Sequence, residues 1–279
     1  MIDNTGCASP NTANTSETTM TKTIFMIHGM CTGGWVWQNY REFFEDKGYR
    51  CIIPTLRFHD ISHDDTPNPR LGTTSLLDYV DDLEKEIRNL GEKPIVMGHS
   101  LGGLLAQMLG SRGLAKALVL LTPAPPAGIW ILKPSMVKAS LSGLKQWGFW
   151  RKPLRQTFNE LVYAALHLMT PAEQREIYNR FVYESGRASC EIGFWFLDSK
   201  RASKVDRVKI TCPVLVIAGA QDRTIPSSVA LQVAHRYKSV STYRELPNHA
   251  HWVVGEPGWQ EITGYICDWL DKGKVDKGG

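Results

Sequence analysis

The stretch P-I-V-M-G-H-S-L-G-G, residues 94–103, organises the rest of the chain. Its first four residues are apolar and typical of a short buried strand, and a helix is predicted from Leu101 to Leu109. Between them, Gly98 and Gly102 bracket Ser100 in a G-x-S-x-G pattern with strand–turn–helix context. A larger side chain at either glycine would collide with the neighbouring strand and helix. The turn therefore exposes the serine hydroxyl at a helix N-terminus, where backbone N–H groups can stabilise an oxyanion.

Length and composition limit the possible classes of protein. A chain of 279 residues with 43% apolar residues can form one large α/β domain or two small ones with a sizeable core. The net charge of +4 is mild and gives no reason to expect a nucleic-acid partner. No apolar run is long enough for a membrane span.

The six cysteines are scattered and show no C-x-x-C spacing. In a chain of this length, such cysteines indicate free thiols in a reducing compartment rather than a disulfide framework or a zinc site. We therefore expect a cytoplasmic protein without a bound metal.

Strands and helices alternate along most of the sequence. Residues 1–21 are rich in Thr, Asn and Ser and are expected to form a flexible leader. Strands are predicted at residues 22–28, 49–53, 94–97, 117–121, 213–218 and 242–246, and helices at 35–47, 75–90, 101–109, 227–237 and 257–270. The connections between the strands need crossovers, so a parallel sheet with helices on both faces is expected.

The alternation is interrupted between residues 123 and 208. This segment holds many aromatic residues, and helical stretches are predicted at 134–143, 151–168, 171–183 and 189–198. An insertion of this size between two strands is interpreted as a helical cap over the ends of the sheet. The predicted domains are thus a core of residues 22–122 and 209–279, and a cap of residues 123–208.

Six basic residues and no acidic residue lie between Gly128 and Asn159. This run could favour an anionic substrate or surface, but a solvated cap exterior is the favoured interpretation, because charged helix faces are common. The polar segment from Leu56 to Thr73 contains His59, His63 and three aspartates. Their spacing matches no metal-ligand pattern, and a solvated loop is predicted.

Three residue types needed for nucleophilic catalysis follow predicted strands. A serine hydroxyl is a weak nucleophile and needs a base, an acid that orients the base, and an oxyanion site. Ser100 follows the third strand, Asp222 the fifth, and His249 and His251 the sixth. Because open parallel sheets place their sites at the carboxyl ends of the strands, these residues are expected to meet.

The chain resembles the α/β-hydrolase superfamily over residues 22–270. The matching motifs are I-H-G-M at Ile27–Met30, G-H-S-L-G-G at Gly98–Gly103, G-A-Q-D-R at Gly219–Arg223 and P-N-H-A-H-W at Pro247–Trp252. The resemblance implies an α/β-hydrolase fold, with about six mainly parallel strands, helices on both faces, and a helical cap inserted after the fourth strand. The early G-M-C-T-G-G-W-V-W is similar to the first loop of plant methylesterases and hydroxynitrile lyases.

Site residues follow from the resemblance by position. It implies Ser100 as nucleophile, Asp222 as acid and His251 as base, since similar members carry N-x-x-H-W there. The oxyanion donors would be the backbone amides of Met30 and Leu101.

Other residues around the predicted site have supporting roles. His28 and His99 are expected to hydrogen-bond the loops, and His249 to have a rim or structural role. Substrate contacts are assigned to Trp35, His99 and Trp252, although both tryptophans could simply pack.

Three function classes remain open at this stage. The leading one is a serine hydrolase that cleaves a small or medium carboxylic ester, lactone or thioester without metal or organic cofactor. A hydroxynitrile lyase, or a cofactor-free dioxygenase, would use the histidine as a base without an acyl-enzyme. A ligand receptor built on the same fold could also retain all three residues. The natural substrate and the oligomeric state are not determined by the sequence.

Overall fold

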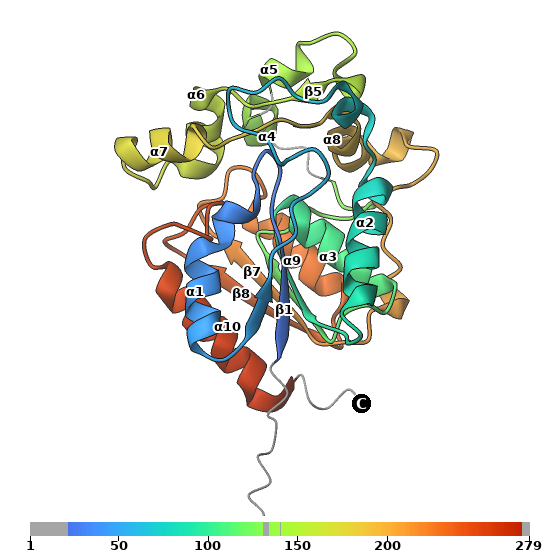
Figure 1. Cartoon of the computed structure of the whole chain (residues 1–279), viewed down its shortest axis with the longest axis vertical. Coiled ribbons are helices and arrows are strands. Elements are labelled where there is room, and N and C mark those ends of the chain that lie inside the picture. The colour runs from blue at the N-terminus through green and yellow to red at the C-terminus, as the bar shows by residue number, and fades with distance from the viewer. Residues whose placement is uncertain (1–21, 131–133, 140, 275–279) are drawn as a thin grey trace, which may run out of the picture.

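A computed structural model describes residues 22–130, 134–139 and 141–274 of the chain (Figure 1). The leader predicted over residues 1–21 lies outside these residues. Within the described part, no helix is both long and apolar enough to cross a membrane.

A six-stranded sheet forms the centre of the described structure. The strand order is β2-β1-β3-β4-β7-β8, and every neighbouring pair is parallel, which confirms the predicted sheet. Its strands are β1 (Thr23–Ile27), β2 (Arg50–Ile52), β3 (Ile95–His99), β4 (Ala117–Leu121), β7 (Val214–Gly219) and β8 (Ser241–Leu246).

Helices cover both faces of the sheet because alternate residues of each strand point to opposite sides. Ile24 and Met26 pack with α1 and α10, whereas Phe25 and Ile27 pack with α2, α3 and α9. The inner strands β1, β3, β4 and β7 are therefore buried and mainly apolar, whereas the edge strand β8 carries polar, partly exposed residues. The helices are α1 (Gln38–Asp46), preceded by η1 (Gly34–Trp37), α2 (Leu76–Asn89), preceded by η2 (Pro69–Thr73), α3 (Leu101–Ser111), α9 (Ser227–Arg236) and α10 (Trp259–Trp269), followed by η7 (Leu270–Lys274).

The insertion, residues 123–208, is gathered at one end of the sheet (Figure 1). Its backbone is anchored to the core where the amide of Val182 donates to the carbonyl of Cys31, at 2.9 Å. Its short elements are α4 (Pro134–Ala139), α5 (Leu141–Leu144), η3 (Phe149–Arg151), β5 (Pro153–Leu154), α6 (Phe158–Leu161), η4 (Val162–Leu166), α7 (Pro171–Tyr178), β6 (Glu184–Ser185), α8 (Gly186–Gly193), η5 (Trp195–Leu197) and η6 (Arg207–Lys209).

The predicted helix over residues 151–168 is wrong in its first half. Pro153 and Leu154 instead pair antiparallel with Ser185 and Glu184. Pro153 has no N–H and disfavours helical geometry in Lys152, so a helix cannot run through this point. Helical structure begins only at α6, where Thr157 and Glu160 form a capping box.

Two glycines let α3 pack directly against the strands. A Cβ atom at Gly102 would overlap the carbonyl oxygen of Ile27, and one at Gly98 would overlap that of Gly102. The predicted collision at these two positions is therefore confirmed. The contact brings the first turn of α3 against the ends of β1 and β3.

We predict that Gly102→Ala destabilises the fold, because α3 must move away from β1 to admit the methyl group. The free energy of unfolding should fall by about 1–3 kcal/mol, as for an overpacked core. Gly264→Ala is a matched control, since Gly264 lies within α10 with open space around its Cβ position. It should stabilise the protein by about 0.5–1 kcal/mol. Urea unfolding of both variants checks this, and equal midpoints would contradict the packing argument.

Candidate active site

Ser100 lies in the tight turn between β3 and α3. Its φ of 54° and ψ of −116° are in a region that residues with a side chain rarely adopt. The turn is held because the Ser100 amide donates to the carbonyl of Leu121 at 3.0 Å. The Ser100 carbonyl accepts from the amides of Gly103 and Ala124, both at 2.9 Å. These bonds fix the direction in which the hydroxyl points.

Ser100, His251 and Asp222 form one hydrogen-bonded chain. His251 Nε2 is 3.0 Å from Ser100 Oγ, and His251 Nδ1 is 2.7 Å from Asp222 Oδ2. All three residues are buried. They come from the ends of β3, β8 and β7, so the sheet brings together residues that are far apart in sequence.

Asp222 is oriented by backbone amides. Its Oδ1 accepts from the amides of Thr224 and Ile225, both at 2.7 Å. The other oxygen therefore faces His251 Nδ1, and a proton on Nδ1 donates to it. Nε2 is then left with a lone pair that can accept the proton of the Ser100 hydroxyl.

The backbone of His251 is held by two further residues. His99 Nε2 donates to the His251 carbonyl at 2.9 Å, and Thr122 Oγ1 donates to the same oxygen at 3.3 Å. Burial, with a contribution from His251, lowers the pKa of His99 to about 3. His99 is therefore neutral and fixes the histidine loop without adding a charge beside it.

Glu256 is a buried carboxylate that the sequence interpretation missed. One of its oxygens accepts from the amide of Ala250 at 2.8 Å and from His249 Nδ1 at 3.2 Å. The other accepts from the amide of Trp252 at 2.8 Å. Glu256 thus binds the residues on both sides of His251. The available signal was an acidic residue in the otherwise apolar sequence Trp252–Gly258.

The predicted solvated loop over residues 56–73 is wrong for His59. This histidine is buried and lies 3.2 Å from Glu184 Oε2, while Tyr79 donates to the other Glu184 oxygen at 2.7 Å. The cause is tertiary, since the insertion supplies the carboxylate. His28 lies beside His59 and accepts from the amide of Leu56 at 3.0 Å through Nε2.

The contact between His59 and Glu184 favours the charged form of both side chains. Burial alone would lower the pKa of His59, but the Glu184 carboxylate raises it above its ordinary value. Burial likewise opposes ionisation of Glu184, yet His59 brings the pKa of that carboxyl below its ordinary value. The stabilisation from His59 is complete below its ordinary pKa and is lost as pH rises through its raised pKa. The stabilisation from Glu184 is complete above its ordinary pKa and is lost as pH falls through its lowered pKa.

A cavity of about 280 Å³ lies between the insertion and the ends of the strands. Met30, Ser100, Leu101, His251 and Trp252 line it from the core. The insertion contributes mostly apolar side chains, among them Leu144, Phe149, Leu154, Leu161, Ile192 and Phe194. The cavity can thus enclose an apolar molecule next to the serine hydroxyl.

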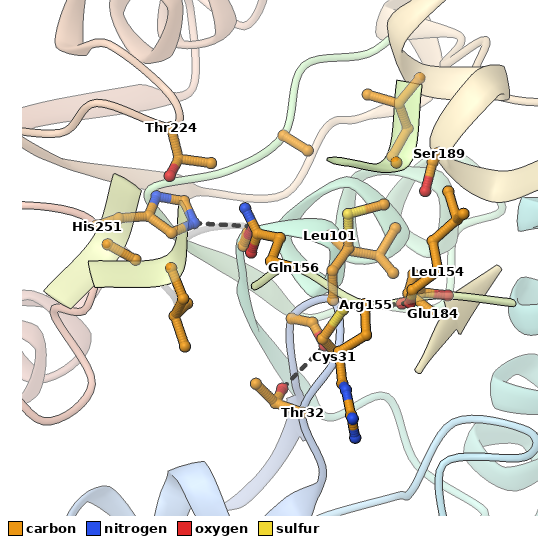
Figure 2. A pocket seen from close by; sticks show the side chains of 18 of the residues that line it. Cys31, Thr32, Leu101, Leu154, Arg155, Gln156, Glu184, Ser189, Thr224 and His251 are labelled. Carbon is orange, nitrogen blue, oxygen red and sulfur yellow. Dashed lines mark hydrogen bonds between the residues drawn. The ribbon is translucent and has the colours of Figure 1, made fainter. Parts of the chain in front are cut away.

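Figure 2 shows how polar groups are distributed around this cavity. His251 and Thr224 lie on one side, and Leu154 and Glu184 lie on the other. The Arg155 guanidinium points away from His251, where it stacks on Tyr183 at 4.6 Å.

Trp35 and Cys31 occupy different positions relative to the cavity. Trp35, predicted to contact substrate, is not among the cavity-lining residues. It packs on Trp252 with the Arg180 guanidinium over its ring. Cys31 does line the cavity, but burial raises the pKa of its thiol, which keeps it protonated.

The sequence of residues 24–259 matches the model of the alpha/beta hydrolase family. The chain belongs to this family. Membership of this family identifies the protein as a hydrolase, which is the class of enzyme that the resemblance implied. A search of curated proteins finds no match to the chain.

Solved structures share the fold at low sequence identity. A monoacylglycerol lipase from Paleococcus ferrophilus is 22% identical with a TM-score of 0.66, covering 90% of this chain and 95% of the lipase. A methylesterase from Arabidopsis is 13% identical with a TM-score of 0.68, and the match covers 90% of this chain and 99% of the methylesterase. The pyrethroid hydrolase PytH is 20% identical with a TM-score of 0.65, covering 90% and 98%.

We predict that Glu256→Gln destabilises the hydrolase by about 1–3 kcal/mol. One carboxylate oxygen of residue 256 becomes an NH₂ group. Two hydrogen-bond donors then face each other, where the oxygen had accepted a hydrogen bond from a buried backbone amide. Glu261→Gln on exposed α10 surface is the matched control and should change stability by less than about 0.5 kcal/mol. Urea unfolding measures both variants, and the same loss in each would show that the buried bonds are not the cause.

Proposed function

We propose that this hydrolase cleaves carboxylic esters through an acyl-enzyme on Ser100. The observation that carries the proposal is the hydrogen-bonded chain from Asp222 through His251 to Ser100, with steps of 2.7 and 3.0 Å, which ends in the cavity. A nucleophile, a base and an orienting acid are the groups that acyl transfer needs.

The reaction proceeds in two halves. His251 Nε2 takes the proton of Ser100 as Oγ attacks the ester carbonyl carbon. His251 then gives this proton to the leaving alcohol oxygen as its bond to the acyl carbon breaks. In the second half, His251 takes a proton from water, the resulting hydroxide attacks the acyl carbon, and the proton returns to Ser100 as the acid leaves. Asp222 stabilises the imidazolium in both halves.

The backbone amides of Met30 and Leu101 are proposed to stabilise the oxyanion. Both residues line the cavity. Leu101 is the first residue of α3, and N–H groups in the first turn of a helix have no acceptor within that helix. The positive end of the helix dipole adds to this stabilisation.

An apolar ester of small or medium size is the substrate class that the cavity supports best. The cavity of about 280 Å³ has mostly apolar walls, which suit an acyl chain or an apolar alcohol. Among the described residues that line it, the one lysine or arginine is Arg155, whose guanidinium points away from His251. Solved structures of the fold include a lipase, a methylesterase and a pyrethroid hydrolase. We propose that the insertion acts as a cap that selects the substrate.

We predict that Ser100→Ala reduces kcat for short p-nitrophenyl esters by at least about 10⁴-fold, because the acyl-enzyme cannot form. Wild type should be labelled by a fluorophosphonate probe and the variant should not. His251→Ala should lose a similar factor, whereas His249→Ala should lose about tenfold or less, since His249 does not reach Ser100. Unfolding curves confirm that each variant is folded.

The outcomes separate the candidate functions. Turnover that persists in Ser100→Ala would contradict the acyl-enzyme and favour base chemistry without a covalent intermediate. A single burst without turnover in wild type would favour a ligand receptor.

We predict that kcat/KM rises with acyl chain length from acetate to about octanoate. Each added methylene that becomes buried should contribute about fourfold, corresponding to about 0.8 kcal/mol. Ile192→Phe should shift the optimum to shorter chains, because Ile192 lines the cavity and the larger ring fills part of it. Steady-state kinetics on an ester series measure this, and a flat profile would mean that the acyl chain binds elsewhere.

A further inference from the structure

We infer that the insertion docks on the surface of an anionic lipid bilayer. The evidence begins with seven large hydrophobic residues of the insertion that are exposed in the described structure. Three of them, Leu144, Trp150 and Leu197, line the cavity or the groove beside it. We define the aromatic patch as Trp130, Trp147, Trp150, Phe196 and Leu197. Trp147 is 86% exposed and Leu197 is 73% exposed, which is costly in water unless a partner covers them.

The aromatic patch is continuous. Trp147 contacts Trp150 at 5.6 Å between ring centroids, and Trp150 contacts Phe149 at 5.4 Å. The series continues from Phe149 to Phe194 at 6.3 Å and from there to Phe196 at 6.4 Å. Phe196 meets Trp130 at 5.0 Å. Two exposed clusters are therefore joined through partly buried rings, as one surface.

This surface is connected to the candidate active site. Phe149 and Phe194 line both the catalytic cavity and the groove that runs between Trp150 and Leu197. Leu144 lines the cavity and is 37% exposed. The aromatic patch and the cavity that contains Ser100 therefore share apolar side chains.

The charges around the aromatic patch favour an anionic partner. Lys145, Arg151 and Lys152 are exposed and flank Trp147 and Trp150 in the sequence. None of these three side chains forms an ion pair with a carboxylate of the described residues. Tryptophan beside lysine and arginine is the composition of segments that bind the headgroup region of a bilayer.

Two carboxylates line the groove, and both are already engaged. Glu191 pairs with Arg187 at 2.8 Å and accepts from Ser75 at 2.8 Å. Asp198 accepts from the amides of Lys200 and Ala202, at 3.0 and 2.6 Å. Arg187 therefore balances the charge of Glu191, and the three cations outnumber the one remaining carboxylate, Asp198.

A second copy of the chain fits this surface less well than a bilayer does. Two copies meeting through the aromatic patch would bring Lys145, Arg151 and Lys152 against one another, and like charges oppose such contact. An anionic bilayer accepts both the indole rings and the cations. The elements that carry the patch, from α5 to η3 and from α8 to η5, lie at the end of the molecule away from the last turn of α10 (Figure 1).

The inference deepens the proposed function, because a bilayer would supply apolar esters directly to the cavity. Docking itself needs no catalysis, so the two proposals are tested separately. Ser100→Ala should bind vesicles as wild type does. Vesicle binding without esterase activity would overturn the proposed function and leave the docking surface intact.

The experiment is co-sedimentation of the full chain with vesicles of phosphatidylcholine containing 30% phosphatidylglycerol, a fraction of about one third chosen to give a clear negative surface potential. Pure phosphatidylcholine vesicles are the uncharged comparison. Wild type should bind the anionic vesicles, and binding should weaken as salt rises. Trp147→Ser/Trp150→Ser should bind at least about tenfold more weakly. Arg151→Gln/Lys152→Gln should lose about fivefold for each charge removed.

Matched controls lie outside the aromatic patch. Val208→Ser removes another exposed apolar side chain, and Lys85→Gln/Lys272→Gln removes two exposed charges. Both should bind as wild type does. Equal binding by the tryptophan variant and wild type, or no binding to anionic vesicles, would overturn the inference. Concentration-dependent dimers that need the tryptophans, with no vesicle binding, would assign the surface to a second copy instead.

Discussion

The close approach of α3 to the ends of β1 and β3 is the constraint on which the rest of the structure depends. It exists only because Gly98 and Gly102 have no Cβ atom to separate the backbones. The chain must then turn sharply at Ser100, whose φ of 54° is tolerated because its amide and carbonyl are both bonded to neighbouring segments. The strain is local, and the hydrogen bonds around it keep the hydroxyl in one direction.

The histidine loop after β8 meets that hydroxyl from the other side. Here the support is electrostatic rather than steric. Asp222 and Glu256 are buried carboxylates whose oxygens accept from backbone amides and histidine nitrogens. Neutral His99 also donates to the His251 carbonyl. Together these contacts hold the imidazole ring of His251 within hydrogen-bond distance of Ser100. Such preorganisation is what the proposed acyl transfer requires of its base.

The insertion has two different surfaces. Toward the core it supplies Glu184 to a buried ion pair and apolar side chains to the cavity. Toward the outside it exposes tryptophans beside lysine and arginine. Phe149 and Phe194 belong to both surfaces. The same short segments therefore form part of the cavity wall and part of the exposed surface.

Local sequence patterns predicted the strands correctly where a strand is buried on both faces of the sheet and must therefore be apolar. The apolar runs at β3, β4 and β7 predicted strands correctly, and the glycines around Ser100 predicted a tight turn that the structure confirms. The placement of Asp222 and His251 at one edge followed from the rule that parallel strands end together. Prediction was poorer in the insertion, where elements are short and Pro153 with Leu154 forms a ribbon rather than a helix.

The sequence by itself indicated the family, the positions of the core strands along the chain and the tight turn at Ser100, because these depend on local periodicity and on backbone sterics. Only the tertiary structure decided the partners of Glu256, His59 and Glu184, and which aromatic residues face the cavity or the outside. A buried carboxylate has no local signature, since its stability depends on donors that come from distant segments. The proposed nucleophile Ser100 comes within 3.0 Å of the proposed base His251 only because β3, β7 and β8 end side by side.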